Sequence, residues 1–356
     1  MSDTTLYIKI LDYLKNLIDE NRDVPNFMLP SERFISLKFC TSRHPVRLAY
    51  DKLIAKNEVV KIHGKGYYIK QSQDDDNADL TNTPKQITFI TPSINSIFSR
   101  ALVSGVEKFC LENHLNLSIE TSNNNILQEK RLLQKSLYTR DNGVILFPCD
   151  NEDDNEILLQ FALKKIPITI LDRYIPGFNF SYVGTDNYLA MVESVEFLYN
   201  LNYKNIVYIS LPRDYATSIA ERINGFNYGL IKYYGSSNSH NLLKISNNKN
   251  EQLTEIENYL KSFPETQVVI ATGNLANAII DVAAKLNIAI PDKLKLMVFD
   301  DELSSLEKKV WQPFVIKQDS ENIGYHAARL TYNQLYGDKR KVITRFQTII
   351  DNYISK

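Results

Sequence analysis

The stretch LPSERFISLKFCTSRHPVRLAYDKL, residues 29–53, decides the fold of the N-terminal part of the chain. Ser31 and Ser42 each precede a run with helical apolar spacing, and a serine hydroxyl in that place accepts hydrogen bonds from the free amides of a first helical turn. Pro45 fits the first turn of the second run, because a proline there removes no intrahelical hydrogen bond. We therefore expect a short helix ending near Phe39 and a second helix that follows Ser42.

The second of these helices has two chemically different faces. Its apolar face consists of Val46, Ala49, Tyr50, Leu53 and Ile54. Arg43 and Arg47 are four residues apart and lie together on another face, with His44 beside them. One face is suited to packing, and the other presents cations.

The flanking segments complete a small module. Apolar residues recur at helical spacing over residues 4–20, and VVKI and YYI surround a turn containing Gly64 and Gly66. Glycine takes the positive φ that tight hairpin turns need, so we expect a two-stranded hairpin carrying Lys61, His63 and Lys65. Three helices followed by such a wing describe a winged helix-turn-helix, in which the second helix of the pair enters the DNA major groove.

Charge is distributed unevenly along the 356 residues, although the net charge is only -1. Residues 1–72 contain 12 Lys and Arg against 8 Asp and Glu, residues 73–79 read QDDDNAD, and residues 80–356 are nearly neutral. The acidic polar strip has no apolar periodicity. We therefore expect a DNA-binding domain at 1–72, a linker at 73–85 and an effector-binding and dimerisation domain at 86–356.

Composition narrows the class of protein. The chain has no apolar run of about 18 residues and no signal-peptide pattern at its start, so we expect a cytoplasmic protein without membrane contact. Three cysteines and five histidines are scattered without ligand spacing. Neither a metal site, a disulfide framework nor a cofactor is expected.

Residues 29–69 resemble the DNA-binding signature of the GntR family, which runs roughly L-P-S-E-R, then S-R-x-x-V-R, then G-x-G before a closing strand. The order and spacing match without gaps, with Asn57 where the family usually has glycine. The resemblance implies that Arg33, Arg43 and Arg47 face DNA. Pattern and resemblance together assign DNA binding to Ser31, Arg33, Thr41, Arg43, His44, Arg47, Lys61, His63, Lys65 and Gly66. Whether Arg43 and Arg47 contact bases or phosphates stays open.

From residue 87 onward, short apolar runs alternate with helical segments. Buried strands are expected at ITFIT (87–91), LSIE (117–120), GVILF (143–147), ITIL (168–171), IVYIS (206–210), VVIA (268–271) and LMVF (296–299). Strand and helix in alternation indicate a mostly parallel sheet covered on both faces. The fold class is thus α/β, with an N-terminal winged helix-turn-helix and a two-lobed body large enough for two such sheets.

Polar residues follow several of these strands, where α/β folds gather their ligands. Ser93, Asn95 and Ser96 follow the first, Asp150 the third, Asp172 and Arg173 the fourth, and Asp300 and Asp301 the last. Carboxylates and guanidinium groups can bind the hydroxyls of a polyol, and Phe98, Tyr174 or Trp311 could cover the apolar face of a sugar. Paired Asp300 and Asp301 also raise the alternative of a catalytic site. Neighbouring side chains at a strand end point in opposite directions, however, so such a pair seldom acts together.

Residues 87–356 resemble the effector-binding domain of LacI/GalR regulators, which is related to periplasmic sugar-binding proteins. The matching segments are IPITILDR, ERINGFNYGL, IPDKLKLMVFDDE and PFVIKQDSENIGYHAARLTYNQL. The resemblance implies effector roles for Arg173, Arg222 and Asp300, and it leaves open whether Arg222 instead braces its own helix. Asn274 stands where the family commonly has an effector-binding Asp. The effector residues expected from placement and resemblance are Ser93, Phe98, Asp172, Arg173, Arg222, Asn274 and Asp300.

A GntR-type head on a LacI-type body is the architecture of the arabinose-repressor group of regulators. We therefore expect a homodimeric, non-enzymatic transcriptional regulator that binds operator DNA and a small-molecule effector, a monosaccharide or sugar derivative. Two alternatives stay open, a ligand-binding sensor that acts through a protein partner and a sugar-modifying enzyme. The chain shows no nucleophile elbow, phosphate loop or histidine-centred triad.

Overall fold

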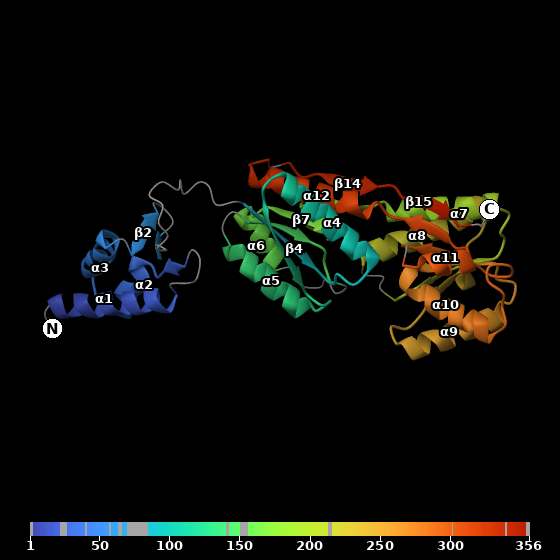
Figure 1. Cartoon of the computed structure of the whole chain (residues 1–356), viewed down its shortest axis with the longest axis horizontal. Helices are drawn as coiled ribbons and strands as arrows, with labels where there is room; N and C mark the ends of the chain where they lie inside the picture. The colour runs from blue at the N-terminus through green and yellow to red at the C-terminus, as the bar shows by residue number, and fades with distance from the viewer. Residues whose placement is uncertain are drawn as a thin grey trace. The chain divides into compact units, whose positions relative to one another are not determined.

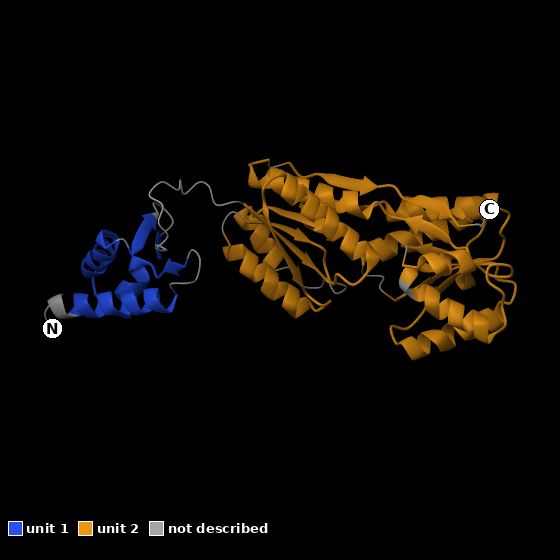
Figure 2. Cartoon of the chain, viewed as in Figure 1, with its two compact units in different colours: residues 1–82 blue, residues 83–356 orange. Residues whose placement is uncertain are grey.

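The structure is a computed structural model that divides the chain into two compact units, residues 1–82 and 83–356 (Figure 2). It describes residues 3–21, 27–39, 41–56, 58–62, 66–69, 85–139, 142–149, 156–212, 216–300, 302–338 and 340–353, with the side chains of 3–5, 62 and 274 left out. Most of the proposed linker at 73–85 lies outside these residues. In the described part of the chain, no helix is both long and apolar enough to cross a membrane.

The first unit consists of three helices and a small antiparallel sheet (Figure 1). Its elements are α1 (Asp3–Glu20), β1 (Met28–Leu29), α2 (Glu32–Lys38), α3 (Arg43–Ala55), β2 (Val59–Ile62) and β3 (Gly66–Ile69), with strand order β1-β3-β2. Ser31 caps α2 as predicted, because its hydroxyl accepts the Phe34 N–H at 3.2 Å. Ser42 occupies the N-cap position of α3, but its side chain makes no capping hydrogen bond. The predicted winged helix-turn-helix is confirmed, with β1 as an additional strand.

The second unit contains two lobes, each built on a six-stranded sheet. The first lobe has the all-parallel order β14-β8-β7-β6-β4-β5. Its strands are β4 (Gln86–Thr91), β5 (Asn116–Thr121), β6 (Asn142–Leu146), β7 (Ile168–Leu171), β8 (Ser181–Thr185) and β14 (Ile343–Phe346). Its helices are α4 (Ile97–Glu112), α5 (Ile126–Tyr138), α6 (Glu156–Lys164) and α12 (Ser320–Leu335). Helices α4 and α12 pack on one face of the sheet, and α5 and α6 pack on the other.

The second lobe has the strand order β10-β9-β11-β12-β13-β15, parallel except for the antiparallel edge strand β15. Its strands are β9 (Ile206–Ser210), β10 (Leu242–Lys244), β11 (Val268–Thr272), β12 (Lys295–Phe299), β13 (Phe314–Lys317) and β15 (Ile349–Asn352). Its helices are α7 (Asn187–Asn200), α8 (Thr217–Tyr234), the short 3-10 helix η1 (Ser239–Asn241), α9 (Lys249–Ser262), α10 (Gly273–Lys285) and α11 (Ser305–Trp311). Helices α7 and α8 cover one face and α9 and α10 the other.

The chain passes between the lobes at residues 185–187, 317–320 and 346–349. Helix α7 begins directly after the first crossing and packs on α8, and α12 begins after the second and packs on α4. Glycines permit both close approaches. A Cβ on Gly105 of α4 would lie 1.9 Å from the Glu321 carbonyl oxygen, and one on Gly225 of α8 would lie 2.2 Å from that of Tyr188. Any side chain larger than hydrogen at either glycine would therefore push the paired helices apart.

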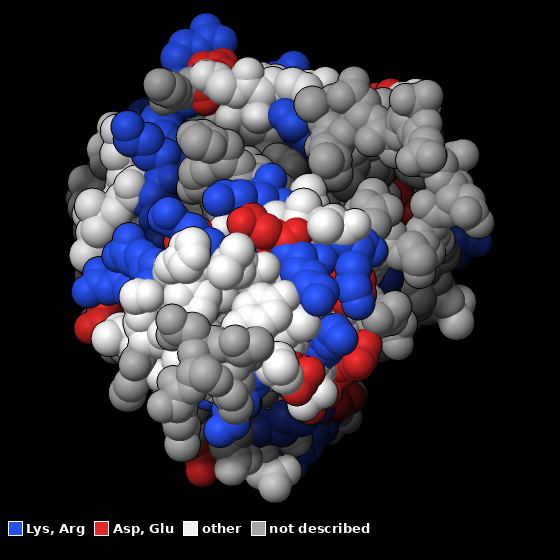
Figure 3. Space-filling view, turned by 90° about the vertical axis from the view of Figure 1, so that its left-hand side faces the viewer, with Lys and Arg blue, Asp and Glu red and all other residues white. Residues whose placement is uncertain are grey.

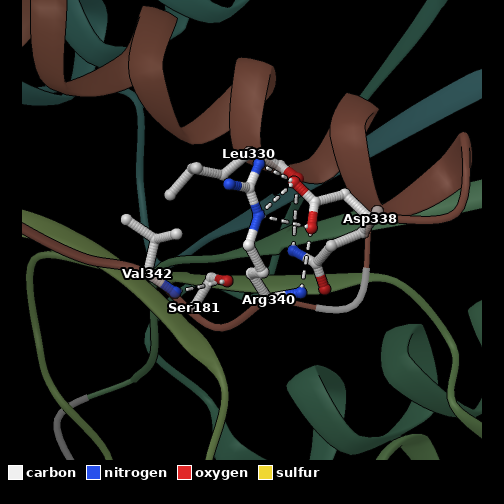
Figure 4. Close-up of polar contacts among 6 residues, drawn as sticks. Ser181, Leu330, Asp338, Arg340 and Val342 are labelled. Carbon is white, nitrogen blue, oxygen red and sulfur yellow. Dashed lines mark hydrogen bonds and ion pairs between the residues drawn. The ribbon is translucent and has the colours of Figure 1, made fainter.

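All seven strands expected from apolar runs are present, but one expectation about burial is wrong. Strand β5, which contains LSIE, lies at the edge of its sheet and has a neighbouring strand on one side only. Its residues are therefore half-buried or exposed. Strand β14 was not expected from the apolar runs, and the turn before it is held by polar contacts (Figure 4). There Arg340 Nε and Nη2 donate to the Asp338 carboxylate, and the Val342 N–H donates to Ser181 Oγ at 3.3 Å.

Candidate nucleic-acid interface and effector cleft

The exposed face of α3 carries the cations expected there. Arg43, His44 and Arg47 are exposed, while Val46 and Tyr50 on the opposite face are fully buried. Tyr50 stacks on the Tyr67 ring at 3.8 Å between centroids and donates its hydroxyl hydrogen bond to the Pro30 carbonyl. The apolar face of α3 is therefore anchored to the rest of the module, and its cationic face lies on the surface.

The Glu32 carboxylate lies between two cations from different elements, Arg47 of α3 and Lys61 of β2. Its Oε2 accepts a hydrogen bond from Arg47 Nε and its Oε1 accepts one from the Tyr67 hydroxyl, both at 2.7 Å, and Lys61 Nζ lies 4.0 Å from Oε1. Although partial burial acts to raise the pKa of Glu32, these two hydrogen bonds hold it below its usual value. The pairing of Arg47 with Glu32 joins α3 to α2, and no local pattern in the sequence predicts it.

The remaining residues assigned to DNA binding lie around this helix pair. Ser31 and Arg33 are exposed on α2 and its cap, and Thr41 is half-buried in the turn before α3. Gly66 begins β3 with φ of 117°, a conformation that favours glycine. His63 and Lys65 lie outside the described residues. Figure 3 shows one face of the molecule on which groups of Lys and Arg side chains gather, with Asp and Glu among them.

A cleft of about 380 Å³ lies between the two lobes of the second unit. Six of the seven expected effector residues line it: Ser93, Phe98, Asp172, Arg173, Arg222 and Asp300. They come from the ends of β4, β7 and β12, from the first turn of α4 and from the second turn of α8. The structure thus brings together residues more than 200 positions apart in the sequence.

Asp172 and Asp300 occupy equivalent places in the two lobes, each directly after a strand. Both have left-handed backbone conformations, with φ of 65° and 73°, which few residues other than glycine adopt and which Asp tolerates better than most. Burial raises the pKa of both carboxyls, while Arg222 acts to lower both and Arg173 acts to lower that of Asp172. Asp172 Oδ1 is buried and has no hydrogen-bond partner among the described residues.

The two arginines of the cleft are held by the protein in different ways. Arg173 Nη1 donates to the Pro148 carbonyl at 2.7 Å, and its guanidinium lies 5.0 Å from the Phe147 ring centroid. Arg222 is buried, donates through Nε to Asn187 Oδ1 at 2.7 Å and stacks 3.5 Å from the Phe299 ring centroid. Arg222 therefore braces its surroundings and also lines the cleft, and its contact with an effector stays a prediction.

The expectation about aromatic residues is only partly met. Phe98 lines the cleft, and Phe147 joins it in an edge-to-face contact at 6.1 Å. Tyr174 and Trp311 do not line the cleft, because each packs against a hydrophobic core. Two of the expected polar residues, Asp150 and Asp301, are not among the described residues, and neither is the side chain of Asn274. Gly273, the neighbour of Asn274, lines the cleft.

Sequence reasoning missed several residues that line the cleft, notably Ser218, Glu302 and Gln318. Gln318 lies in the second crossing segment, donates to Asp300 Oδ1 and accepts a hydrogen bond from the Thr185 hydroxyl in the first crossing segment. It therefore connects the cleft to both crossing segments. The only signal in the sequence was the position of QDS directly after the apolar run FVIK.

Residues 87–339 match the profile of the family described as periplasmic binding protein domain. The chain belongs to this family. In this member of the periplasmic binding protein domain family, residues 6–69 additionally match the profile described as bacterial regulatory proteins, gntR family. The chain thus combines a gntR-family DNA-binding domain with a periplasmic-binding-protein-like domain, as the two sequence resemblances implied.

Curated relatives of this family member are transcriptional regulators. The arabinose metabolism transcriptional repressor of Halalkalibacterium halodurans is 25% identical over 337 residues, covering 92% of this chain and 88% of the relative. The HTH-type transcriptional regulator KdgR of Bacillus subtilis is 25% identical over 260 residues, covering 72% and 75%. Among solved structures, the transcriptional regulator CelR-cellobiose complex has a TM-score of 0.65 at 18% identity, covering 87% of this chain and 89% of that one. This last likeness concerns the fold.

Proposed function

We propose that the chain is a sequence-specific DNA-binding transcriptional regulator of a carbohydrate-utilisation operon, controlled by a small sugar or sugar derivative bound in the cleft between the lobes. It acts as a homodimer, in which effector binding changes the distance between two DNA heads. The observation that carries the proposal is a gntR-family head on the same chain as a cleft lined by buried and half-buried carboxylates and guanidinium groups.

The head supports DNA binding through the geometry of α3. Arg43, His44 and Arg47 project from one side of a helix whose other side is buried, which is the arrangement that a recognition helix needs in the major groove. Glu32 presets the position of Arg47, so less side-chain freedom is lost when Arg47 meets a base or a phosphate. In this proposal, Lys61 of the wing contacts the backbone of the same duplex.

The chemistry of the cleft supports a neutral polyhydroxylated effector. Asp172 and Asp300 balance Arg173 and Arg222, and the third carboxylate of the lining, Glu302, accepts the Ile97 N–H, so the lining has no excess of positive charge for an anionic ligand. Hydroxyl groups both donate and accept, and the partnerless Oδ1 of Asp172 offers an acceptor for one of them. Phe98 provides an apolar surface for a sugar ring. A volume of about 380 Å³ is at the small end of ligand pockets and favours a monosaccharide.

The test combines a sugar screen with a DNA-binding assay on the full chain. Arabinose, ribose and cellobiose are compared by thermal shift, in which a ligand at 100 times its Kd adds about 2.7 kcal/mol of stability. We expect a monosaccharide to raise the melting temperature and to change the affinity for an operator selected from random duplexes. No binding to any duplex after selection would contradict the DNA-binding part of the proposal.

Calorimetry on variants then tests the site. Asp300→Asn and Arg173→Ala should each weaken binding of the active sugar by about 1–3 kcal/mol, because each leaves a hydroxyl of the bound sugar without its partner. Asp338→Asn is the matched control, since Asp338 pairs with Arg340 in the turn before β14 and does not line the cleft. If the cleft variants bind as tightly as this control, the sugar binds elsewhere.

A further inference from the structure

The two lobes contact each other across the cleft through a residue to which no role has been assigned. Glu302 follows β12 in the second lobe and lines the cleft. Its Oε1 accepts a hydrogen bond from the Ile97 N–H, the first amide of α4 in the first lobe, at 3.0 Å. Residues 205 positions apart in the sequence are thereby joined across the space where the effector is proposed to bind.

The partner of Glu302 is an amide that its own helix cannot satisfy. The first four N–H groups of an α-helix have no partner within the helix. Ser96 caps α4 by accepting the Ser99 N–H at 3.0 Å, which leaves the Ile97 N–H to another acceptor. A carboxylate is the preferred acceptor at this end of a helix, because the helix dipole is positive there. The bond is therefore a helix cap supplied by the opposite lobe.

A movement at this bond must be shared by a large part of the first lobe. Helix α4 is fixed to α12 by the close approach at Gly105, and α12 begins at the second crossing segment. On the other lobe, Glu302 stands two residues after Asp300, whose carboxylate accepts from Gln318 in that same crossing segment. The bond thus adds a direct link between the two lobes to the covalent links that the crossing segments provide.

We propose that Glu302 is a positioning residue that holds the cleft closed by capping α4 across the lobes, and thereby sets the effector affinity. This inference rests on the proposed function, in which the cleft binds the effector. A ligand that needs the closed arrangement binds with an apparent affinity proportional to the fraction of chains that adopt it. Loss of the cap lowers that fraction and weakens binding, without removing any contact made by Asp172 or Asp300.

Other contacts hold the lobes together when the Glu302 bond is removed. Arg345 of β14 in the first lobe donates from both terminal nitrogens to Glu221 of α8 in the second, at 3.0 and 2.8 Å. Thr217 Oγ1 of α8 also donates to the Tyr174 carbonyl at 3.0 Å. A chain without the Glu302 bond therefore keeps joined lobes, and the expected change is a shift in their spacing rather than unfolding.

The first experiment needs no effector. Spin labels are attached to Leu127→Cys on α5 and Asn258→Cys on α9, both exposed, in the full chain carrying Cys40→Ser. The native Cys110 and Cys149 are buried, which raises their pKa to about 11 and about 12 and makes them unreactive toward the label. Pulsed electron paramagnetic resonance then gives the distribution of distances between the lobes.

Glu302→Ala should raise the ratio of long to short distances about tenfold, as expected for the loss of a charged cap worth about 1.4 kcal/mol. Glu302→Gln keeps an acceptor oxygen but no charge and should lie in between. Glu307→Ala is the matched control, because Glu307 Oε2 accepts the Ser304 N–H at 2.7 Å and so caps a helix within its own lobe. Distributions that coincide for wild type, Glu302→Ala and the control would overturn the proposal.

Calorimetry with arabinose gives a second, separable readout. We expect Glu302→Ala to weaken arabinose binding by a similar factor, with Glu307→Ala unchanged. If the wild-type chain does not bind arabinose, arabinose is not its effector. The distance measurement needs no effector and still decides the role of Glu302. If the distances shift while arabinose affinity does not, closure is not coupled to binding and the inference fails.

Discussion

Arg222→Ala is the substitution for which the structure allows the most detailed forecast. Arg222 is buried and donates to Asn187 Oδ1, which is itself fully buried, so the substitution leaves an acceptor without a donor at a cost of about 1–3 kcal/mol. Loss of the stacking on Phe299 adds up to about 2 kcal/mol. The substitution also removes the cation that lies beside two carboxylates, which leaves their charges uncompensated. Taken together, we expect the free energy of unfolding to fall by about 3–5 kcal/mol.

The loss should also depend on pH. Burial already raises the pKa of Asp172 and Asp300 in the folded chain, and Arg222 opposes this effect. Without Arg222 their folded pKa values rise further, while the unfolded values stay near 3.8. A carboxyl whose folded pKa is raised stabilises the fold below its unfolded pKa, and this contribution is lost as the pH rises through the folded pKa. The variant should therefore lose about 1 kcal/mol less at about pH 5 than at about pH 8.

Urea unfolding followed by tryptophan fluorescence measures this change, because the single tryptophan, Trp311, packs against the core of the second lobe. Lys232→Ala on the exposed face of the same helix is the control and should unfold like wild type. A loss for Arg222→Ala of less than about 1 kcal/mol at about pH 8, within the range of ordinary surface changes, would refute the assignment of Arg222 as the counter-charge of the two carboxylates.

Three further substitutions and one titration test other parts of the argument. Raising salt from about 50 to about 200 mM should weaken operator binding markedly, since counterion release dominates binding by a basic head, and a flat fluorescence-anisotropy response would contradict this. Arg47→Ala should weaken operator binding at least about fivefold in the same assay while sugar binding stays unchanged. Gly105→Ala should destabilise the second unit by about 1–3 kcal/mol in urea unfolding, because its Cβ would overlap the Glu321 backbone. Asn274→Asp should alter the rank order of sugars bound in calorimetry, and an unchanged order would remove Asn274 from the specificity argument.

Local signals made much of this architecture predictable. The cap at Ser31, the opposite faces of α3 and the wing follow from residue types a few positions apart, and each central strand is an apolar run of about five residues. Strands β8, β10, β13, β14 and β15 were not assigned from apolar runs. In β14, exposed residues alternate with half-buried ones, and in β15 two half-buried residues lie between two exposed ones, so no continuous buried run marks these edge strands.

The sequence by itself determined that Asp172 and Arg173 end one strand and that Asp300 ends another, because a strand end is a local property. Only the tertiary structure decided that these groups share one cleft with Arg222, that Glu32 holds Arg47, and that Glu302 caps a helix of the opposite lobe. The physical reason is that such contacts depend on how sheets and crossing segments bring distant residues together. Partners that lie far apart in the sequence have no fixed spacing, so they form no local pattern in the chain. Only the packing of the lobes brings them together.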